Sequence, residues 1–228
     1  MASTNSLLDE LVALLPIQIT QIQVQKKNKE RYSLYHKDTF LLGVSIQTLI
    51  TYNLKKGTIL DEGLVLDIQN QEEQSRCKDY LLGLLARRDH SLQELKTKGL
   101  KKGYSSKRLD TVLASLLELN YVDNTRFAER YIHDAVELKK WSLNRIASEL
   151  QKKGISRSVY TPILNQYSTD LWLTQMQALV KKNYRKFTRI ESDKRKKKLY
   201  DFLARKGYSP TLIWSHMNNL LSLIETTD

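Results

Sequence analysis

Three short stretches of the sequence place two basic residues directly before a glycine and a serine two positions after it: LKKGYSS at 100–106, QKKGISR at 151–157 and ARKGYSP at 204–210. Their glycines, Gly103, Gly154 and Gly207, are 51 and 53 residues apart. Paired cations of this kind bind carboxylate or phosphate groups through charge-assisted hydrogen bonds. The same composition also suits a helix end, where lysines face the negative end of the helix dipole, glycine turns left-handed and serine caps the next helix. For the glycines and serines we expect the helix-end role, and for the lysines both roles stay open.

The charge of the chain is unevenly distributed. Its net charge of +12 and isoelectric point near 9.6 indicate an acidic or polyanionic partner. Residues 1–78 hold nine basic and nine acidic side chains, whereas residues 79–228 hold 28 basic and 16 acidic ones. The whole excess of twelve positive charges therefore lies in the second part.

Residue patterns of known catalytic sites are missing from the sequence. It has no GxxxxGK[ST], GxGxxG, GxSxG or HExxH motif. The four histidines are widely spaced and have no cysteine partners, so we expect surface histidines and no metal site. Asp123, Glu129, Asp134 and Glu137 lie on one charged helical segment, where ion pairing is the usual outcome. We therefore expect neither enzyme activity nor a cofactor.

The sequence also limits the compartment. No apolar run approaches the roughly 20 residues that span a bilayer, and the first 16 residues have no basic region before their short apolar stretch. The single cysteine, Cys77, cannot form an internal disulfide. We expect a cytoplasmic protein with no membrane partner.

The first 70 residues combine strand and helix signals. In residues 17–25, isoleucine or valine recurs at nearly every second place, with a phase slip that predicts a bulge or bend in a strand. Residues 31–36 and 39–44 read as a hairpin around the polar pair Lys37–Asp38. Ser45 can then cap a short helix. These signals predict a small α+β unit that contains a β-hairpin.

From about residue 72 the strand signals end, and a repeat of about 50 residues indicates stacked helical modules. Superimposing the first two glycines of the repeat also superimposes Ser91 on Ser142, and each of these serines is predicted to cap a helix. Glu94 completes a reciprocal capping box with Ser91. Ser142 is instead followed at the third place by Arg145, so it can supply only its own half of the box.

The segment 119–132 contains the clearest helix start of the chain. Asp123 is its predicted cap, and the following residues place Phe127 and Tyr131 on one broad apolar face that suits a core rather than a ligand site. Arg126, one turn before a second arginine, is expected to pair with acidic side chains on the same or a neighbouring helix.

The third repeat departs from the first two. It has extra residues between its first two helices, while Ser209 and Pro210 predict a firm start for its last helix. Pro162 falls inside the helix expected after a capping Ser156, so that helix either restarts with Thr161 as its cap or is kinked. The predicted fold is mainly α, with tandem three-helix modules after the α+β unit. The expected parts are residues 1–70, 71–122, 123–169 and 170–228.

Several stretches together resemble the bacterial RecX regulatory proteins: ITQIQVQKKNKERYSLY, LLARRDHSLQELKTKGLKKGYS, LLELNYVDNTRFAERYI, SLNRIASELQKKGIS and LYDFLARKGYSP. The resemblance covers roughly residues 17–221. Its most specific element is the third stretch, where Asp123, Arg126, Phe127 and Tyr131 match the aspartate, arginine and two aromatic positions of the family. We expect these four residues to be mainly structural.

The resemblance implies a protein that binds the RecA recombinase and restrains it. RecX proteins are similar in having three-helix modules in an elongated, curved array with a basic face. They lie in the groove of the RecA filament on single-stranded DNA and block its extension, ATP hydrolysis, strand exchange and support of repressor self-cleavage. A monomer that lies along the filament is expected.

The residues of this chain that would contact RecA or its DNA are chosen by their charge and their position in the repeat, and the resemblance does not assign them. A direct, sequence-tolerant nucleic-acid binder is the alternative, although no recognition helix rich in Arg, Asn and Gln stands out. An enzyme such as a nuclease is a third and weaker reading. The candidate partner-binding residues are Arg87, Arg88, Lys101, Lys102, Arg145, Lys152, Lys153, Lys194, Arg195, Lys196, Lys197, Lys198, Arg205 and Lys206.

Overall fold

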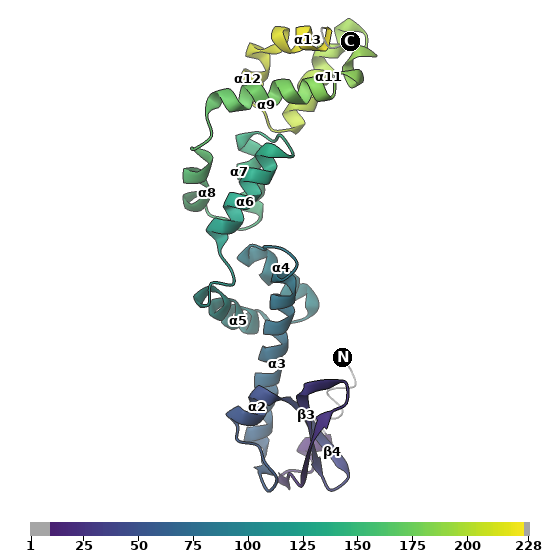
Figure 1. Cartoon of the computed structure of the whole chain (residues 1–228), viewed down its shortest axis with the longest axis vertical. Helices are drawn as coiled ribbons and strands as arrows, with labels where there is room; N and C mark the ends of the chain where they lie inside the picture. The colour runs from purple at the N-terminus through teal and green to yellow at the C-terminus, as the bar shows by residue number, and fades with distance from the viewer. Residues whose placement is uncertain (1–9, 226–228) are drawn as a thin grey trace. The chain divides into compact units, whose positions relative to one another are not determined.

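The computed structural model describes residues 10–225; residues 1–9, part of the expected N-terminal unit, and residues 226–228 lie outside that description. The chain is mostly helical and has small sheets near its N-terminus, which confirms the predicted fold class (Figure 1). It divides into two compact units. The first holds the residues up to Gly83 together with Lys107–Val112, and the second holds Leu84–Ser106 together with the residues from Leu113 onward.

The first unit contains all five strands of the described chain. They are β1 (Ile17–Gln18), β2 (Gln21–Gln25), β3 (Asn28–His36), β4 (Thr39–Ser45) and β5 (Ile59–Leu60). One antiparallel sheet has the order β2-β3-β4, and β1 pairs with β5 in a second. The strand predicted over 17–25 is interrupted at Ile19 and Thr20, where the phase slip falls. Lys37 takes a φ of 52° between β3 and β4, which confirms the predicted hairpin turn.

Two helices pack with these sheets, α2 (Ile46–Thr51) and α3 (Glu62–Leu85). Ser45 caps α2 as predicted, because its hydroxyl accepts a hydrogen bond from the Thr48 N–H at 3.1 Å. The buried Glu72 of α3 accepts from the Ser45 N–H and pairs with Arg31 of β3 at 2.9 Å. α3 runs without a break through residues 70 and 71, where a part boundary was expected.

The second unit is helical and has an extended apolar interior. Buried side chains from Phe127 to Ile224 form one hydrophobic core, so the helices after residue 123 share a common interior. Figure 1 shows α6, α7 and α8 as one group and α9, α11, α12 and α13 as another. The helices after α3 are α4 (Leu92–Lys102), α5 (Ser106–Glu118), α6 (Asn124–Glu137), α7 (Leu143–Lys152), α8 (Arg157–Leu164), α9 (Thr169–Lys182), α10 (Arg185–Thr188), α11 (Ser192–Arg205), α12 (Pro210–Ser215) and α13 (Met217–Glu225).

The helix-end role of the repeated glycines is confirmed. Gly103, Gly154 and Gly207 have φ values of 101°, 74° and 88°, in the region that favours glycine. Ser91 and Ser142 cap α4 and α7, and Ser91 also forms the predicted reciprocal box with the side chain at its third following position.

Two predicted helix starts differ from the structure. Ser156 precedes α8, but its hydroxyl makes no capping hydrogen bond and lies instead 2.9 Å from the hydroxyl of Ser158, so the predicted side-chain cap is wrong. α8 passes through Pro162, so no helix restarts at Thr161.

The end of the chain and one histidine also differ from expectation. Ser209 caps α12 and Pro210 occupies its first turn, as predicted. The segment was expected to form one last helix, but it divides at His216 into α12 and α13. His90 is buried rather than at the surface, with its Nδ1 3.0 Å from the Arg88 carbonyl oxygen. The prediction failed because the ring has a backbone partner that takes the place of water.

The helices found over residues 10–225 include none whose length and apolar character would allow it to cross a membrane.

Candidate functional site

The end of α7 docks on the start of α4, and we call this contact the first junction. Ser91 donates its hydroxyl proton to the Lys153 carbonyl oxygen at 2.7 Å and accepts from the Glu94 N–H at 3.1 Å. A Cβ atom on Gly154 would lie 2.6 Å from the Cβ of Gln93. Glycine is therefore needed here both for the left-handed turn and for the close approach of the two helices.

A carboxylate pairs with two cations at the first junction. Glu94 accepts from Lys153 Nζ at 2.6 Å and from Arg88 Nη1 at 3.2 Å. Burial raises the pKa of the Glu94 carboxyl, but the hydrogen bonds and charges of Lys153 and Arg88 outweigh burial and hold that pKa below its usual range. Two of the predicted partner-binding cations therefore serve an internal contact.

The end of α11 docks on the start of α7 in the same way, and we call this contact the second junction. The Ser142 N–H donates to the Lys206 carbonyl oxygen at 3.1 Å. A Cβ atom on Gly207 would lie 2.5 Å from the Cβ of Arg145 and 2.7 Å from the Ser142 hydroxyl oxygen. Both junctions thus use the glycine after a basic pair to bring a helix end against a capping serine.

The second junction has an arginine where the first has its carboxylate. Arg145 follows its capping serine by three positions, as Glu94 does. Its guanidinium donates to the Arg205 carbonyl oxygen and has its Cζ 4.2 Å from the Trp141 ring centroid, and Lys139 Nζ lies 4.5 Å from the same centroid. With nearby lysines these cations form the junction cluster, which we define as Lys139, Arg145, Lys182, Lys186, Arg205 and Lys206.

The junction cluster carries an excess of positive charge. Lys206 Nζ donates to the Lys139 carbonyl oxygen at 3.3 Å. Partial burial lowers the pKa of the Lys206 ammonium, and the charges of Arg145, Lys186 and Lys182 lower that pKa further. Over residues 10–225, no member of the cluster forms an ion pair with a carboxylate. Such a cluster attracts an anion from solution.

The other predicted contact residues do not join into one site. Arg195 is 17% exposed and pairs with Glu225 at 3.5 Å, while Lys152 pairs with Glu149 at 2.9 Å and Lys194 with Glu191 at 2.7 Å. Of the predicted set, the structure brings Arg145, Arg205 and Lys206 together in the cluster, and Arg88 and Lys153 together at the first junction. The exposed remainder is Arg87, Lys101, Lys102, Lys152, Lys194, Lys196, Lys197 and Lys198.

The four motif residues lie at the start of α6 and along its packed face. The Asp123 carboxylate accepts from two backbone N–H groups in the first turn of α6. Phe127 and Tyr131 stack with ring centroids 5.9 Å apart. Arg126 approaches Asp89 on a neighbouring segment at 4.0 Å. All these contacts are internal to the fold.

A hollow of about 840 Å³ lies beside this motif. Its apolar lining includes Phe127, Tyr131 and Ile163, and its rim includes Asp89 and Arg130, which pair with each other. Because these rim charges are already paired, the hollow offers weaker attraction for an ion than the junction cluster does.

Sequence reasoning missed Lys139, Trp141, Lys182 and Lys186 as members of this region. Their positions in the sequence give no direct signal, because they come from α9, α10 and the connection between α6 and α7. The local clue was Arg145, which breaks the capping-box pattern of the preceding repeat. Metal chemistry has no support within residues 10–225, where no group of three His, Cys, Asp or Glu side chains could hold an ion.

Stacked helical modules joined by helix-end junctions, with surplus cations at one of them, define a modular, basic helical protein. The chain belongs to the RecX family. The family model described as the regulatory protein RecX N-terminal domain matches residues 17–61, and those for the second and third RecX three-helix domains match 123–160 and 173–217.

Curated relatives match the chain over nearly its whole length. Regulatory protein RecX of Clostridium tetani is 31% identical over 212 residues, which cover 92% of this chain and 95% of the relative. Regulatory protein RecX of Clostridioides difficile is 29% identical and covers 91% of this chain and 97% of the relative.

Solved structures support the fold. A crystal structure of regulatory protein RecX aligns with a TM-score of 0.71 and 23% identity, covering 86% of this chain and 96% of that one. RecX from Lactobacillus salivarius aligns with a TM-score of 0.56 and 19% identity over 66% of this chain and 97% of the other.

Proposed function

We propose that this protein binds the RecA recombinase on single-stranded DNA and restrains it, in the cytoplasm and as a monomer. The observation that carries the proposal is the match over nine-tenths of the chain to a relative that is named a regulatory protein RecX. The proposed action is occupation of the filament groove, which would hinder filament extension, ATP hydrolysis, strand exchange and repressor self-cleavage.

Electrostatics supports this partner. The excess positive charge lies after residue 78, and a RecA filament on DNA presents acidic groups and phosphates along a repeating polymer. Exposed charges act over about 8 Å at physiological salt, so attraction of this kind weakens as salt rises. We propose no catalytic step for the protein and no cofactor.

The two junctions separate the candidate residues that hold the fold together from those that can contact a partner. Lys153 is engaged with Glu94, so we assign it to the structure of the array. Lys101, Lys152 and Arg205, the first basic residues of the three repeated pairs, are exposed and suit partner contact. We add the junction cluster as a second contact surface. We also retain the four-part division at residues 1–70, 71–122, 123–169 and 170–228 as part of this proposal.

RecA ATPase activity on single-stranded DNA tests the proposal. Substoichiometric amounts of this protein are expected to lower the steady-state rate, because one molecule placed in the groove or at a filament end affects many RecA subunits. A rate that stays unchanged even at equimolar protein would contradict the proposal.

Direct binding to nucleic acid is the second candidate, and the junction cluster favours it. Free single-stranded DNA as the main partner predicts tight binding without RecA, with a salt slope of about −0.7 per phosphate neutralised. A filament partner predicts inhibition at protein concentrations too low to coat naked DNA. Fluorescence anisotropy of a labelled oligonucleotide over a salt series, beside the ATPase assay, separates the two.

A further inference from the structure

Both junctions bring a glycine-ended helix against a capping serine, and they differ in charge at the third residue after that serine. In the first, the third residue after the capping serine is Glu94, which pairs with Lys153 across the contact. In the second, that position is Arg145, which faces Lys206 across the contact and adds to its positive charge. A carboxylate at the position of Arg145 could pair with Lys206, as Glu94 pairs with Lys153. Positive charge that no ion pair offsets attracts a ligand of opposite sign.

Helix dipoles explain only part of the cluster. Lys182 ends α9, Arg205 ends α11 and Lys139 follows the end of α6, and each helix end contributes about half a negative charge. Three such ends offset roughly one and a half of the six positive charges. Glu149 on α7 partly offsets the charge of Arg145, but its carboxylate accepts its hydrogen bond from Lys152 at 2.9 Å. Most of the positive charge is left for a group from outside the protein.

We propose that the junction cluster is a binding site for a phosphate group, held by cations from both sides of the second junction. Arg145 and Lys139 belong to the α7 side, and Lys206, Lys186 and Lys182 belong to the α11 side. Phosphate matches the set because its dianion has several acceptor oxygens for one guanidinium and several ammonium groups.

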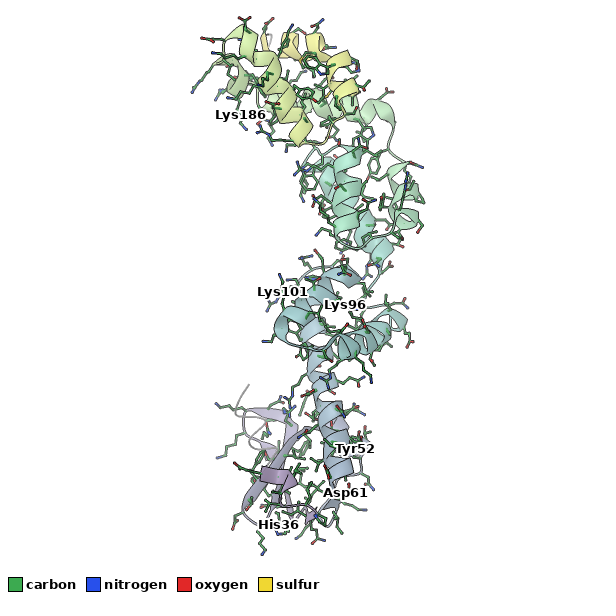
Figure 2. The ribbon with its side chains drawn as sticks, turned by 180° about the vertical axis from the view of Figure 1, so that it is seen from behind. His36, Tyr52, Asp61, Lys96, Lys101 and Lys186 are labelled. Carbon is green, nitrogen blue, oxygen red and sulfur yellow. The ribbon has the colours of Figure 1, made fainter. Side chains whose placement is uncertain are left out.

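Parts of the site are already fixed in place. The guanidinium of Arg145 is held by the Arg205 carbonyl oxygen and by the Trp141 ring, and Lys206 is held by the Lys139 carbonyl oxygen. Lys186 projects from α10 at the surface (Figure 2), and its Nζ lies 5.9 Å from the Phe202 ring centroid. Donors that are already held in place reduce the ordering cost of binding.

Phosphate at this site would also stabilise the contact between α7 and α11. Bound phosphate would replace repulsion between Arg145 and Lys206 by attraction of both to one anion. The inference goes beyond RecA regulation and is tested without RecA, so failure of either proposal leaves the other standing.

Titration with inorganic phosphate, at constant ionic strength set by sodium chloride, tests the site in the full chain. Calorimetry is expected to show binding, and the unfolding midpoint is expected to rise by about 3 °C at ten times the dissociation constant. The variant Lys182→Gln/Lys186→Gln, which changes two exposed side chains, should weaken phosphate binding by about tenfold.

A matched control is available on the same part of the chain. Lys181→Gln/Arg189→Gln removes the same net charge from exposed positions on α9 and next to α10, and should bind phosphate like the unchanged protein. An equal loss of phosphate affinity in both double variants would overturn the proposal. So would an unfolding midpoint that is the same in phosphate and in chloride at equal ionic strength.

A second arm of the experiment distinguishes the sources of the phosphate. Saturation by inorganic phosphate indicates a free phosphate ligand. A response to oligothymidylate at phosphate-group concentrations where inorganic phosphate gives none indicates backbone phosphates of a nucleic acid. Either response supports the site only when Lys182→Gln/Lys186→Gln weakens it by about tenfold, and an unchanged response in that variant would place the binding elsewhere.

Discussion

The first and second junctions join different pairs of helices at equivalent ends, α7 to α4 and α11 to α7, with opposite charge at one equivalent position. In each, a glycine after a basic pair lets a helix end approach a capping serine. Glu94 pairs with Lys153 across the first contact, whereas Arg145 adds a positive charge that repels Lys206 at the second. The docking geometry therefore does not depend on the charge, and the charge at the second junction is available for another use. A positive residue in a repeat is not evidence of a binding surface until its partner across the contact is known.

The largest loss of stability is expected from substitution of the glycines, because both junctions need them equally. Gly154→Ala and Gly207→Ala should each lower the free energy of unfolding by about 3 kcal/mol, because a left-handed alanine is strained and its Cβ would overlap Gln93 or Arg145. Denaturant unfolding followed by circular dichroism measures the loss.

Gly57→Ala is the matched control for strain without docking. Gly57 also has a positive φ, of 97°, but an added Cβ would meet only Gln18 Nε2 at 3.9 Å. Its expected cost is about 1 kcal/mol. Equal losses at Gly57 and Gly154 would show that close helix approach contributes nothing.

The next largest loss of stability is expected when the carboxylate of the first junction is removed, a change that has no counterpart at the second junction. Glu94→Gln should lower the free energy of unfolding by about 1.5 kcal/mol, because it leaves the partly buried Lys153 and the more exposed Arg88 without their charged acceptor. A double-mutant cycle with Lys153→Gln should give a coupling energy that accounts for most of the loss. Additive effects in that cycle would refute the pairing.

Placing a carboxylate at the second junction, as at the first, should raise the free energy of unfolding by a smaller amount. Arg145→Glu places a carboxylate opposite Lys206, as Glu94 lies opposite Lys153, and should raise the free energy of unfolding by about 0.5 kcal/mol. Phosphate titration of this variant should no longer raise its unfolding midpoint. A destabilised but folded Arg145→Glu protein would show that the guanidinium contacts with Trp141 and the Arg205 carbonyl outweigh the repulsion.

The smallest effects on stability are expected from pH. Both groups make stability rise with pH, but Glu94 acts in the acidic range and Lys206 in the alkaline range. The pKa of Glu94 is lowered in the folded state, so its contribution is complete above its ordinary value of 4.5 and is lost as pH falls through the folded-state pKa. The pKa of Lys206 is also lowered, so stability rises as pH increases from the folded-state pKa toward the ordinary value of 10.5.

Unfolding midpoints measured over a pH series can resolve these two contributions. Glu94→Gln should remove part of the stability loss at acidic pH, and Lys206→Met should remove part of the stability gain at alkaline pH. A pH profile that is identical in the unchanged protein and in Glu94→Gln would contradict the assigned role of the carboxylate.

Much of the local structure was predictable from the sequence, because short-range rules govern it. The left-handed glycines, the capping box at Ser91, the hairpin turn at Lys37 and the apolar face of α6 each depend on residues a few positions apart. Ser156 failed as a side-chain cap because its hydroxyl has Ser158 as an alternative partner.

The candidate site was only partly predictable, because it depends on contacts between distant residues. Lys153 and Glu94 are 59 positions apart, and Arg145 and Arg205 are 60 apart. No periodicity shows which lysine of a pair faces a neighbouring module. Arg145 carried the one local signal, since it breaks the pattern set by Glu94.

The most direct test of the account compares inhibition of RecA ATPase on single-stranded DNA by two double variants. Lys182→Gln/Lys186→Gln removes charge from the second junction, and Lys181→Gln/Arg189→Gln removes equal charge beside it. We predict that the first variant needs about tenfold more protein for half-inhibition, while the second stays within about twofold of the unchanged protein. Equal inhibition by both variants would contradict a role for the second junction in partner binding.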